Sequence, residues 1–88
     1  MRILFSSRGW EDYLHWQAAD PVMLERINIL IRECRRTPFE GIGKPEPLKG
    51  NLKGWWSRRI NTADRLVYRV SGAGDAQTLE IAQCRFHY

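Results

Sequence analysis

The clearest pattern of hydrophobic positions in the chain predicts a helix over residues 21–36. Asp20 is a favourable N-cap, and Pro21 suits the first helical position because its missing N–H would have no partner there. The helix is expected to end before Pro38, since the residue preceding a proline avoids helical dihedral angles. Apolar residues recur at the spacing of one helix face at Met23, Ile27, Leu30, Ile31 and Cys34. This face is therefore expected to lie in the core.

A second pattern, nearer the N-terminus, predicts a strand followed by another helix. Arg2–Phe5 is short, apolar and partly β-branched, as in a strand, and Ser6 or Ser7 then offers a helix N-cap. The helix that follows is expected to form an antiparallel hairpin with residues 21–36, because the connection between them is very short. Three aromatic residues and one leucine of this helix are interpreted as core packing or as a subunit contact. They are Trp10, Tyr13, Leu14 and Trp16.

After a loop over residues 39–51, rich in glycine and proline, the apolar residues begin to alternate, as in strands. In the last strand Leu79 and Ile81 alternate in one phase, and Cys84 and Phe86 in the other. This change of phase predicts a β-bulge near Gln83. Strands are predicted over Trp55–Ile60, Arg65–Val70 and Thr78–Phe86.

The resulting order, β-α-α-β-β-β, belongs to the α+β class: two N-terminal helices packed on an antiparallel sheet. The length of 88 residues fits a single domain over residues 1–88 with a small core, which a partner or a second copy would help to stabilise. No apolar run approaches the roughly 20 residues that cross a bilayer. The N-terminal apolar stretch is too short for a secretory signal, so the expected location is the cytoplasm, with no membrane association.

The cysteines and histidines are few and widely separated. Cys34 and Cys84 match no metal-ligand spacing, and neither do His15 and His87. The cysteines are therefore expected to be buried thiols, and neither a metal nor a cofactor is predicted.

Charge is concentrated in the middle of the chain. The net charge is +4, whereas residues 44–69 hold seven basic and two acidic residues, a net of +5. Such a segment suits a polyanion, and the adjacent Trp55 and Trp56 suit single-stranded nucleic acid. A solvated charged face is the equally ordinary alternative. On the first interpretation, the RNA-binding residues are Lys44, Lys49, Lys53, Arg58 and Arg59.

Four residues could do the chemistry of RNA cleavage without a metal. Glu46, isolated between two prolines, could act as a base, Arg65 could neutralise a phosphate, and His87 and Tyr88 end the chain. Each also has an ordinary interpretation: a solvated glutamate, a surface arginine and a frayed tail. Their spacing alone does not decide between these interpretations, because only folding would bring Glu46 to His87.

Several segments resemble the YoeB/Txe toxins of the RelE superfamily, and the resemblance runs from the first strand to the last residue. The strings RTPFEG and GKPEPLK are especially specific. The resemblance implies a bacterial toxin of a type II toxin–antitoxin pair with a RelE-like, microbial-ribonuclease-like fold. The matching segments are Arg35–Gly41, Gly43–Lys49, Trp56–Ile60, Arg65–Tyr68 and Cys84–Tyr88.

The same resemblance implies an endoribonuclease, an mRNA interferase that cleaves messenger RNA in the ribosomal A site and thereby inhibits translation and growth. It implies Glu46 as general base, Arg65 as the phosphate-stabilising residue and His87 as general acid, with Tyr88 needed for activity. Lys49 and Arg59 match basic positions near the substrate. The turn over residues 71–76 is longer than the family pattern and lies far in sequence from these positions.

The expected partners are the ribosome, its mRNA, a second copy of the chain and a cognate antitoxin. A homodimer is expected to use Trp10, Tyr13 and Trp16. The antitoxin is expected to lay an acidic, disordered C-terminal segment on the basic region and to displace a loosely attached tail over Arg85–Tyr88. Two other functions remain open: a gyrase-poisoning toxin of the ParE branch, and a plain RNA- or ribosome-binding module.

Overall fold

Two helices form a hairpin in the computed structural model, which describes residues 1–88. Helix α1 (Ser7–Ala19) begins at Ser6, whose hydroxyl accepts a hydrogen bond from a backbone N–H of the first turn. Helix α2 (Pro21–Arg36) begins at Asp20, whose carboxylate caps two backbone N–H groups. The predicted bounds of α2 and both predicted N-cap positions are confirmed. Neither helix is long and apolar enough to cross a membrane.

One five-stranded sheet packs against this hairpin, with the strand order β1-β5-β4-β3-β2. The strands are β1 (Arg2–Phe5), β2 (Glu46–Pro47), β3 (Trp56–Arg59), β4 (Arg65–Ser71) and β5 (Thr78–Gln83). All neighbouring pairs are antiparallel except β1 and β5, which run parallel. The predicted antiparallel sheet is confirmed, except that β1 pairs in parallel with β5. Parallel pairing needs a long crossover between strands, and the chain between β1 and β5 includes the helical hairpin.

The predicted loop over residues 39–51 contains the short edge strand β2, which the sequence analysis missed. Two residues are too few to show an alternating pattern. Pro47 has no N–H for a sheet ladder, and it is tolerated because β2 has a neighbour on one side only. Strand β5 is shorter than predicted, because it ends at Gln83 and not at Phe86. The residues after it form a separate tail.

The predicted bulge is present at the end of β5. Val67 pairs with Gln83, whereas the next residue, Tyr68, pairs with Ile81, so Ala82 is the extra residue. An extra residue shifts the alternation of side chains by one position. This shift explains how β5 and the residue after it bury three side chains on the helix side, at Leu79, Ile81 and Cys84.

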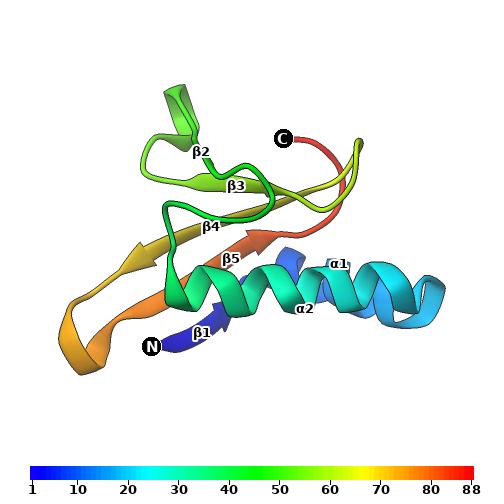
Figure 1. Ribbon diagram of the computed structural model, residues 1–88, viewed down its shortest axis with the longest axis horizontal. Helices are drawn as coiled ribbons and strands as arrows, with labels where there is room; N and C mark the ends of the chain where they lie inside the picture. The colour runs from blue at the N-terminus through cyan, green and yellow to red at the C-terminus, as the bar shows by residue number, and fades with distance from the viewer.

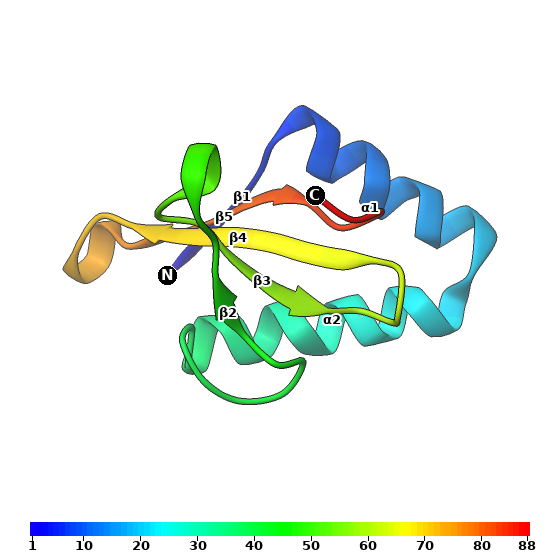
Figure 2. The same ribbon diagram turned by 90° about the horizontal axis from the view of Figure 1, so that it is seen from above.

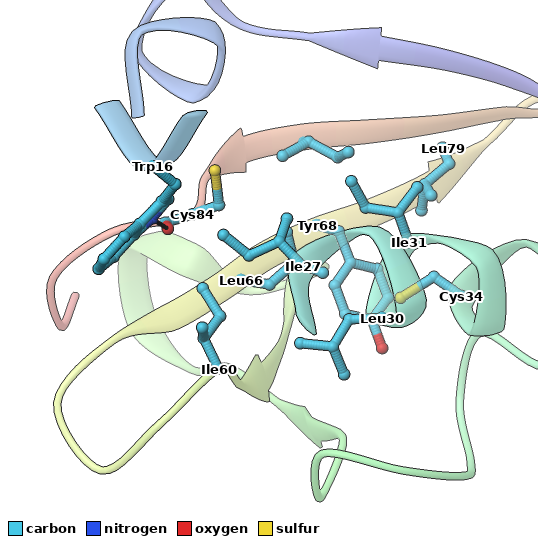
Figure 3. Close-up of a cluster of buried hydrophobic side chains, with 11 residues drawn as sticks. Trp16, Ile27, Leu30, Ile31, Cys34, Ile60, Leu66, Tyr68, Leu79 and Cys84 are labelled. Atoms are coloured by element: carbon cyan, nitrogen blue, oxygen red, sulfur yellow. Dashed lines mark hydrogen bonds between the residues drawn. The ribbon is translucent and has the colours of Figure 1, made fainter. Parts of the chain in front are cut away.

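The core lies between α2 and the sheet (Figure 3). The predicted stripe of α2 is buried there at Ile27, Leu30, Ile31 and Cys34. Trp16 of α1 joins this core, and its indole N–H donates to the Cys84 carbonyl at 2.7 Å. Both cysteines are free and buried, as predicted.

The helices cover one face of the sheet and leave the other face open. Figure 1 shows α2 on one side of β3, β4 and β5, and the C-terminal tail on the opposite side. Figure 2 shows the β4–β5 hairpin at the end of the sheet away from the β3–β4 turn. The long turn over residues 71–76 lies in this hairpin, where it forms a short 3-10 helix over Gly74–Ala76. The tail and the β3–β4 turn are thus well separated from it.

Candidate active site on the open face of the sheet

A row of side chains crosses the open face from the edge of the sheet inward. Glu46 of β2 pairs with Ser57 of β3, which pairs with Val67 of β4, which pairs with Gln83 of β5. Paired residues point to the same face, so these side chains are neighbours. The inner members are buried, Ser57 with 3% of its surface exposed, whereas Glu46 is exposed. A solvent-accessible carboxylate therefore stands at the end of a buried row.

Two arginines lie side by side in the next row of the same face. Arg59 of β3 pairs with Arg65 of β4, and neither forms a salt bridge with an acidic residue. Like charges directly opposite each other on a sheet are destabilising, which an anion between them would relieve. Arg65 donates through Nη1 to backbone carbonyls of the β3–β4 turn, at Asn61, Thr62 and Asp64. Its Nε and Nη2 make no hydrogen bond within the chain and keep some access to solvent.

The tail brings the last two residues of the chain back to this face. The Tyr88 hydroxyl lies 3.4 Å from the Ser57 hydroxyl. The rings of His87 and Tyr88 lie 4.6 Å apart, and both side chains are exposed. Because Ser57 is also the register partner of Glu46, the structure places the tail and the carboxylate around one serine.

Hydrogen bonds attach the tail at more points than expected from the sequence, although Phe86, His87 and Tyr88 are exposed. Gln83 donates through its side-chain amide to the Arg85 carbonyl at 3.2 Å. The Phe86 N–H donates to the Asp64 carboxylate at 2.6 Å, and the Phe86 carbonyl accepts from the Arg65 N–H at 3.0 Å. Displacing the tail would therefore require a partner to replace several hydrogen bonds.

Most of the predicted RNA-binding residues are exposed to solvent. Lys44, Lys49, Lys53 and Arg59 are all exposed, and none of them forms a salt bridge. Lys49 and Lys53 flank a 3-10 turn over Gly50–Leu52, just beyond β2. These cations are thus free to meet a polyanion.

Arg58 is different, and the prediction that it binds RNA is wrong. It lies on the helix side of β3, opposite Leu66, and 0% of its surface is exposed. Its guanidinium donates to the Tyr68 hydroxyl and to three carbonyls of the loop before β2, those of Thr37, Glu40 and Ile42. Arg58 therefore holds the loop that leads to Glu46 against the sheet.

The groups around Arg58 are strongly affected by burial. Burial raises the pKa of Tyr68 to about 12, and hydrogen bonding to Arg58 opposes part of this change. Burial likewise raises the pKa of Cys34 to about 11. At the start of the tail, burial and the nearby Asp12 carboxylate raise the pKa of Cys84 to about 12. These groups are neutral at physiological pH and contribute to packing.

Three residues that place the tail were not predicted from the sequence: Ser57, Asp64 and Gln83. For Ser57 and Gln83 no sequence signal was available, because a polar residue on a strand does not reveal its partner. The Asn61–Asp64 pattern does predict a turn, since asparagine and aspartate side chains bond to nearby backbone. It does not predict that the Asp64 carboxylate also reaches Phe86.

Comparison with known proteins identifies the family. Residues 5–88 match the family of YoeB-like toxins of bacterial type II toxin–antitoxin systems. The chain belongs to this family. A YoeB toxin from Streptomyces coelicolor is 56% identical to it over 88 residues, which is the full length of both chains.

Solved structures of YoeB proteins share the fold as well as the sequence. A YoeB/ParE toxin from Agrobacterium tumefaciens is 57% identical over the full length of both chains, with a TM-score of 0.96. The YoeB dimer from Staphylococcus aureus is 45% identical to this YoeB-like toxin, with a TM-score of 0.87 over 100% of this chain and 98% of that one. A second structure from that organism is a heterotetrameric YoeB–YefM toxin–antitoxin complex.

The fold extends to more distant toxins. The RelBE2 toxin–antitoxin complex from Mycobacterium tuberculosis includes a chain that is 21% identical, with a TM-score of 0.69 over 98% of this chain and 96% of that one. The predicted RelE-like fold is thereby confirmed.

Proposed function

We propose that this toxin is a metal-independent endoribonuclease that cleaves messenger RNA in the ribosomal A site and so stops translation and growth. The observation that carries the proposal is the convergence on Ser57. Its register partner is Glu46, its hydroxyl lies 3.4 Å from that of Tyr88, and the Arg59–Arg65 pair occupies the next row. A proton acceptor, paired cations and the Tyr88 hydroxyl thus share one face, and the His87 ring lies 4.6 Å from the Tyr88 ring. The place of action would be the cytoplasm.

In the proposed reaction, Glu46 removes the proton from the 2′-hydroxyl of the RNA. The 2′-oxygen then attacks the adjacent phosphorus, and the bond from phosphorus to the 5′-oxygen breaks. His87 donates a proton to that leaving oxygen, so the products are a 2′,3′-cyclic phosphate and a 5′-hydroxyl end. Arg65 stabilises the negative charge that develops on the phosphoryl oxygens, through the guanidinium nitrogens that have no partner within the chain. Base, cation and acid are all side chains, so the scheme uses no metal.

The surrounding cations suit an RNA substrate. Four exposed basic residues would neutralise phosphates on either side of the cleaved bond. They are Lys44, Lys49, Lys53 and Arg59. Tyr88, with 44% of its surface exposed, offers a ring on which a base could stack.

Two partners are proposed from the relatives. The Staphylococcus aureus YoeB forms a complex with YefM, and an antitoxin with an acidic C-terminal segment would suit the basic face of this chain. The dimer known from that organism supports a homodimer here. Trp16 is buried and cannot belong to its interface, contrary to the sequence prediction, whereas Trp10 is exposed.

The test of function measures cleavage of ribosome-bound mRNA by purified variants. Glu46→Gln and His87→Gln are each expected to lower the cleavage rate about 10²–10⁴-fold, because each removes a general acid or base. Glu40→Gln and His15→Gln are matched controls: Glu40 lies in the same loop, and His15 packs against Trp16 in α1. Both controls are expected to cleave at the parental rate.

Parental rates in both Glu46→Gln and His87→Gln would overturn the assignment. If the parent stopped growth without cutting mRNA and inhibited gyrase, it would belong to the other branch of these toxins. Ribosomes need magnesium, so metal independence is measured separately, on free RNA in the presence of a chelator. Activity that is lost there and restored by one particular metal would contradict the mechanism.

A further inference from the structure

We propose that Asp64 is a positioning residue for the C-terminal tail. Its carboxylate fixes the backbone of Phe86 and thereby directs His87 and Tyr88 back over the open face. The effect on cleavage rests on the proposed function, whereas the effect on the tail does not. Asp64 lies outside all the residues assigned above to RNA or to chemistry.

The Asp64 carboxylate is held on both sides. Oδ1 accepts from the Phe86 N–H at 2.6 Å, and Oδ2 accepts from the Asn61 side-chain amide at 2.9 Å. Asn61 in turn accepts from the N–H groups of Ala63 and Asp64 at 2.8 and 2.7 Å, which closes the turn. A short hydrogen bond to an ionised acceptor is stronger than a neutral one. The turn therefore presents Phe86 with a preoriented acceptor.

Phe86 has a backbone conformation that needs such support. Its φ is +66°, in the left-handed region that non-glycine residues rarely adopt. Its N–H is bound to Asp64, and its carbonyl accepts from the Arg65 N–H at 3.0 Å. Two adjacent residues, Asp64 at the end of the turn and Arg65 at the start of β4, thus hold both polar groups of Phe86. The left-handed turn reverses the chain, so that the Tyr88 hydroxyl arrives beside Ser57.

The same turn also orients Arg65, so it links two parts of the candidate site. The Arg65 guanidinium donates to the Asn61 carbonyl at 2.8 Å and to the Asp64 carbonyl at 3.0 Å. Neither Asp64 nor Phe86 belongs to the buried core, and 53% of the Phe86 surface is exposed. Loss of the carboxylate should therefore disturb the tail much more than the fold.

The test compares Asp64→Ala and Asp64→Asn with the parent in steady-state cleavage of ribosome-bound mRNA and in amide hydrogen exchange. Asp64→Ala is expected to lower kcat about 100-fold with little change in KM, the loss typical of a small misplacement of catalytic groups. The Phe86 amide should exchange much faster, while the amide of the core residue Tyr68 keeps its protection. Asp64→Asn keeps an oxygen acceptor for Phe86 but turns an NH2 donor toward the Asn61 side-chain amide, so it should restore both properties only in part.

Asp75→Ala is the matched control for the change in charge. Asp75 is exposed in the β4–β5 hairpin, far from the tail, and its side chain forms no salt bridge. It should leave kcat and Phe86 exchange unchanged. Exchange is measured in the Glu46→Gln background as well, so that it does not depend on activity.

Three outcomes would overturn the proposal. In one, Asp64→Ala leaves Phe86 exchange as slow as in the parent. In another, the Tyr68 amide loses protection to the same extent, which would mean that Asp64 only stabilises the fold. In the third, Phe86 exchanges faster but kcat does not change. If the parent itself does not cleave mRNA, the proposed function fails, and the exchange data still decide whether Asp64 holds the tail.

Discussion

Replacement of Arg58 by methionine tests whether this arginine serves the fold or the RNA. Methionine has a similar length but no donors, so Arg58→Met removes the bonds to Tyr68 and to the loop carbonyls while the strand keeps its shape. The charge pattern of the sequence grouped Arg58 with the RNA-binding residues. The structure buries it completely.

The expected cost follows from two opposing effects. Taking one partner out of a buried, hydrogen-bonded charge network typically costs about 3–5 kcal/mol. Some of the loop carbonyls regain water, because their bonds to Arg58 are only partly buried, which favours the lower end of this range. A domain of 88 residues has a total stability of about 4–13 kcal/mol. Arg58→Met should therefore lower the melting temperature by roughly 12–24 °C.

The assay is urea and thermal unfolding followed by tryptophan fluorescence, in the Glu46→Gln background so that cells survive production. Arg59→Met is the matched control, since it is the next residue on the same strand but exposed. It should change stability by less than about 0.5 kcal/mol. In a plot of log affinity for single-stranded RNA against log salt concentration, the slope for Arg59→Met should be smaller in magnitude by about 0.7. Arg58→Met should leave that slope unchanged.

One result would refute this reasoning. If Arg58→Met unfolded at the parental urea midpoint and instead reduced the salt slope for RNA, Arg58 would be a phosphate contact that becomes exposed in solution. Should the methionine variant not fold at all, Arg58→Lys provides the same comparison. Lysine keeps the charge but has fewer donors, so an intermediate stability is expected.

Two further predictions concern the core and the surface. The unfolded thiols and phenol ionise near pH 9.0 and 10.0, whereas burial raises the pKa of Cys34 to about 11 and those of Cys84 and Tyr68 to about 12. The unfolded state therefore loses protons first, and the free energy of unfolding should fall as the pH rises above about 9; a flat profile of urea midpoints between pH 7 and 11 would contradict this. Trp10, with 47% of its surface exposed, should contribute to a dimer, so that Trp10→Ser weakens self-association in sedimentation while Val22→Ser, at a site with 69% exposure, does not. Equal association of both variants would refute the interface.

The elements with many apolar residues were predictable because their spacing reports on a buried face. Helix α2 was found with its exact N-cap, and the phase change in the last strand revealed the bulge at Ala82. Features without such a repeat were not found. Strand β2 is too short, and the parallel pairing of β1 depends on the path of the whole chain.

The residues of the candidate site likewise fall into those that could be predicted from the sequence and those that could not. The resemblance to YoeB/Txe toxins pointed to Glu46, Arg65, His87 and Tyr88, whereas charge alone could not separate Arg58 from Arg59. These two arginines are adjacent on one strand and therefore lie on opposite faces of β3, but only the folded structure shows that Arg58 is the one that faces the core. Hydrogen bonds between distant residues, such as Asp64 to Phe86, leave no periodic trace in the sequence.

The strand order also determines when the toxin can fold during its own synthesis. Strand β5 lies between β1 and β4 in the sheet, yet it follows every other strand in the chain. Until Thr78–Gln83 emerges from the ribosome, β1 has no partner, and the Trp16 indole lacks its acceptor at Cys84. Contacts across such sequence separations form late. A nascent chain therefore cannot complete its sheet before Thr78–Gln83 has been synthesised, because β5 is the strand that joins β1 to β4.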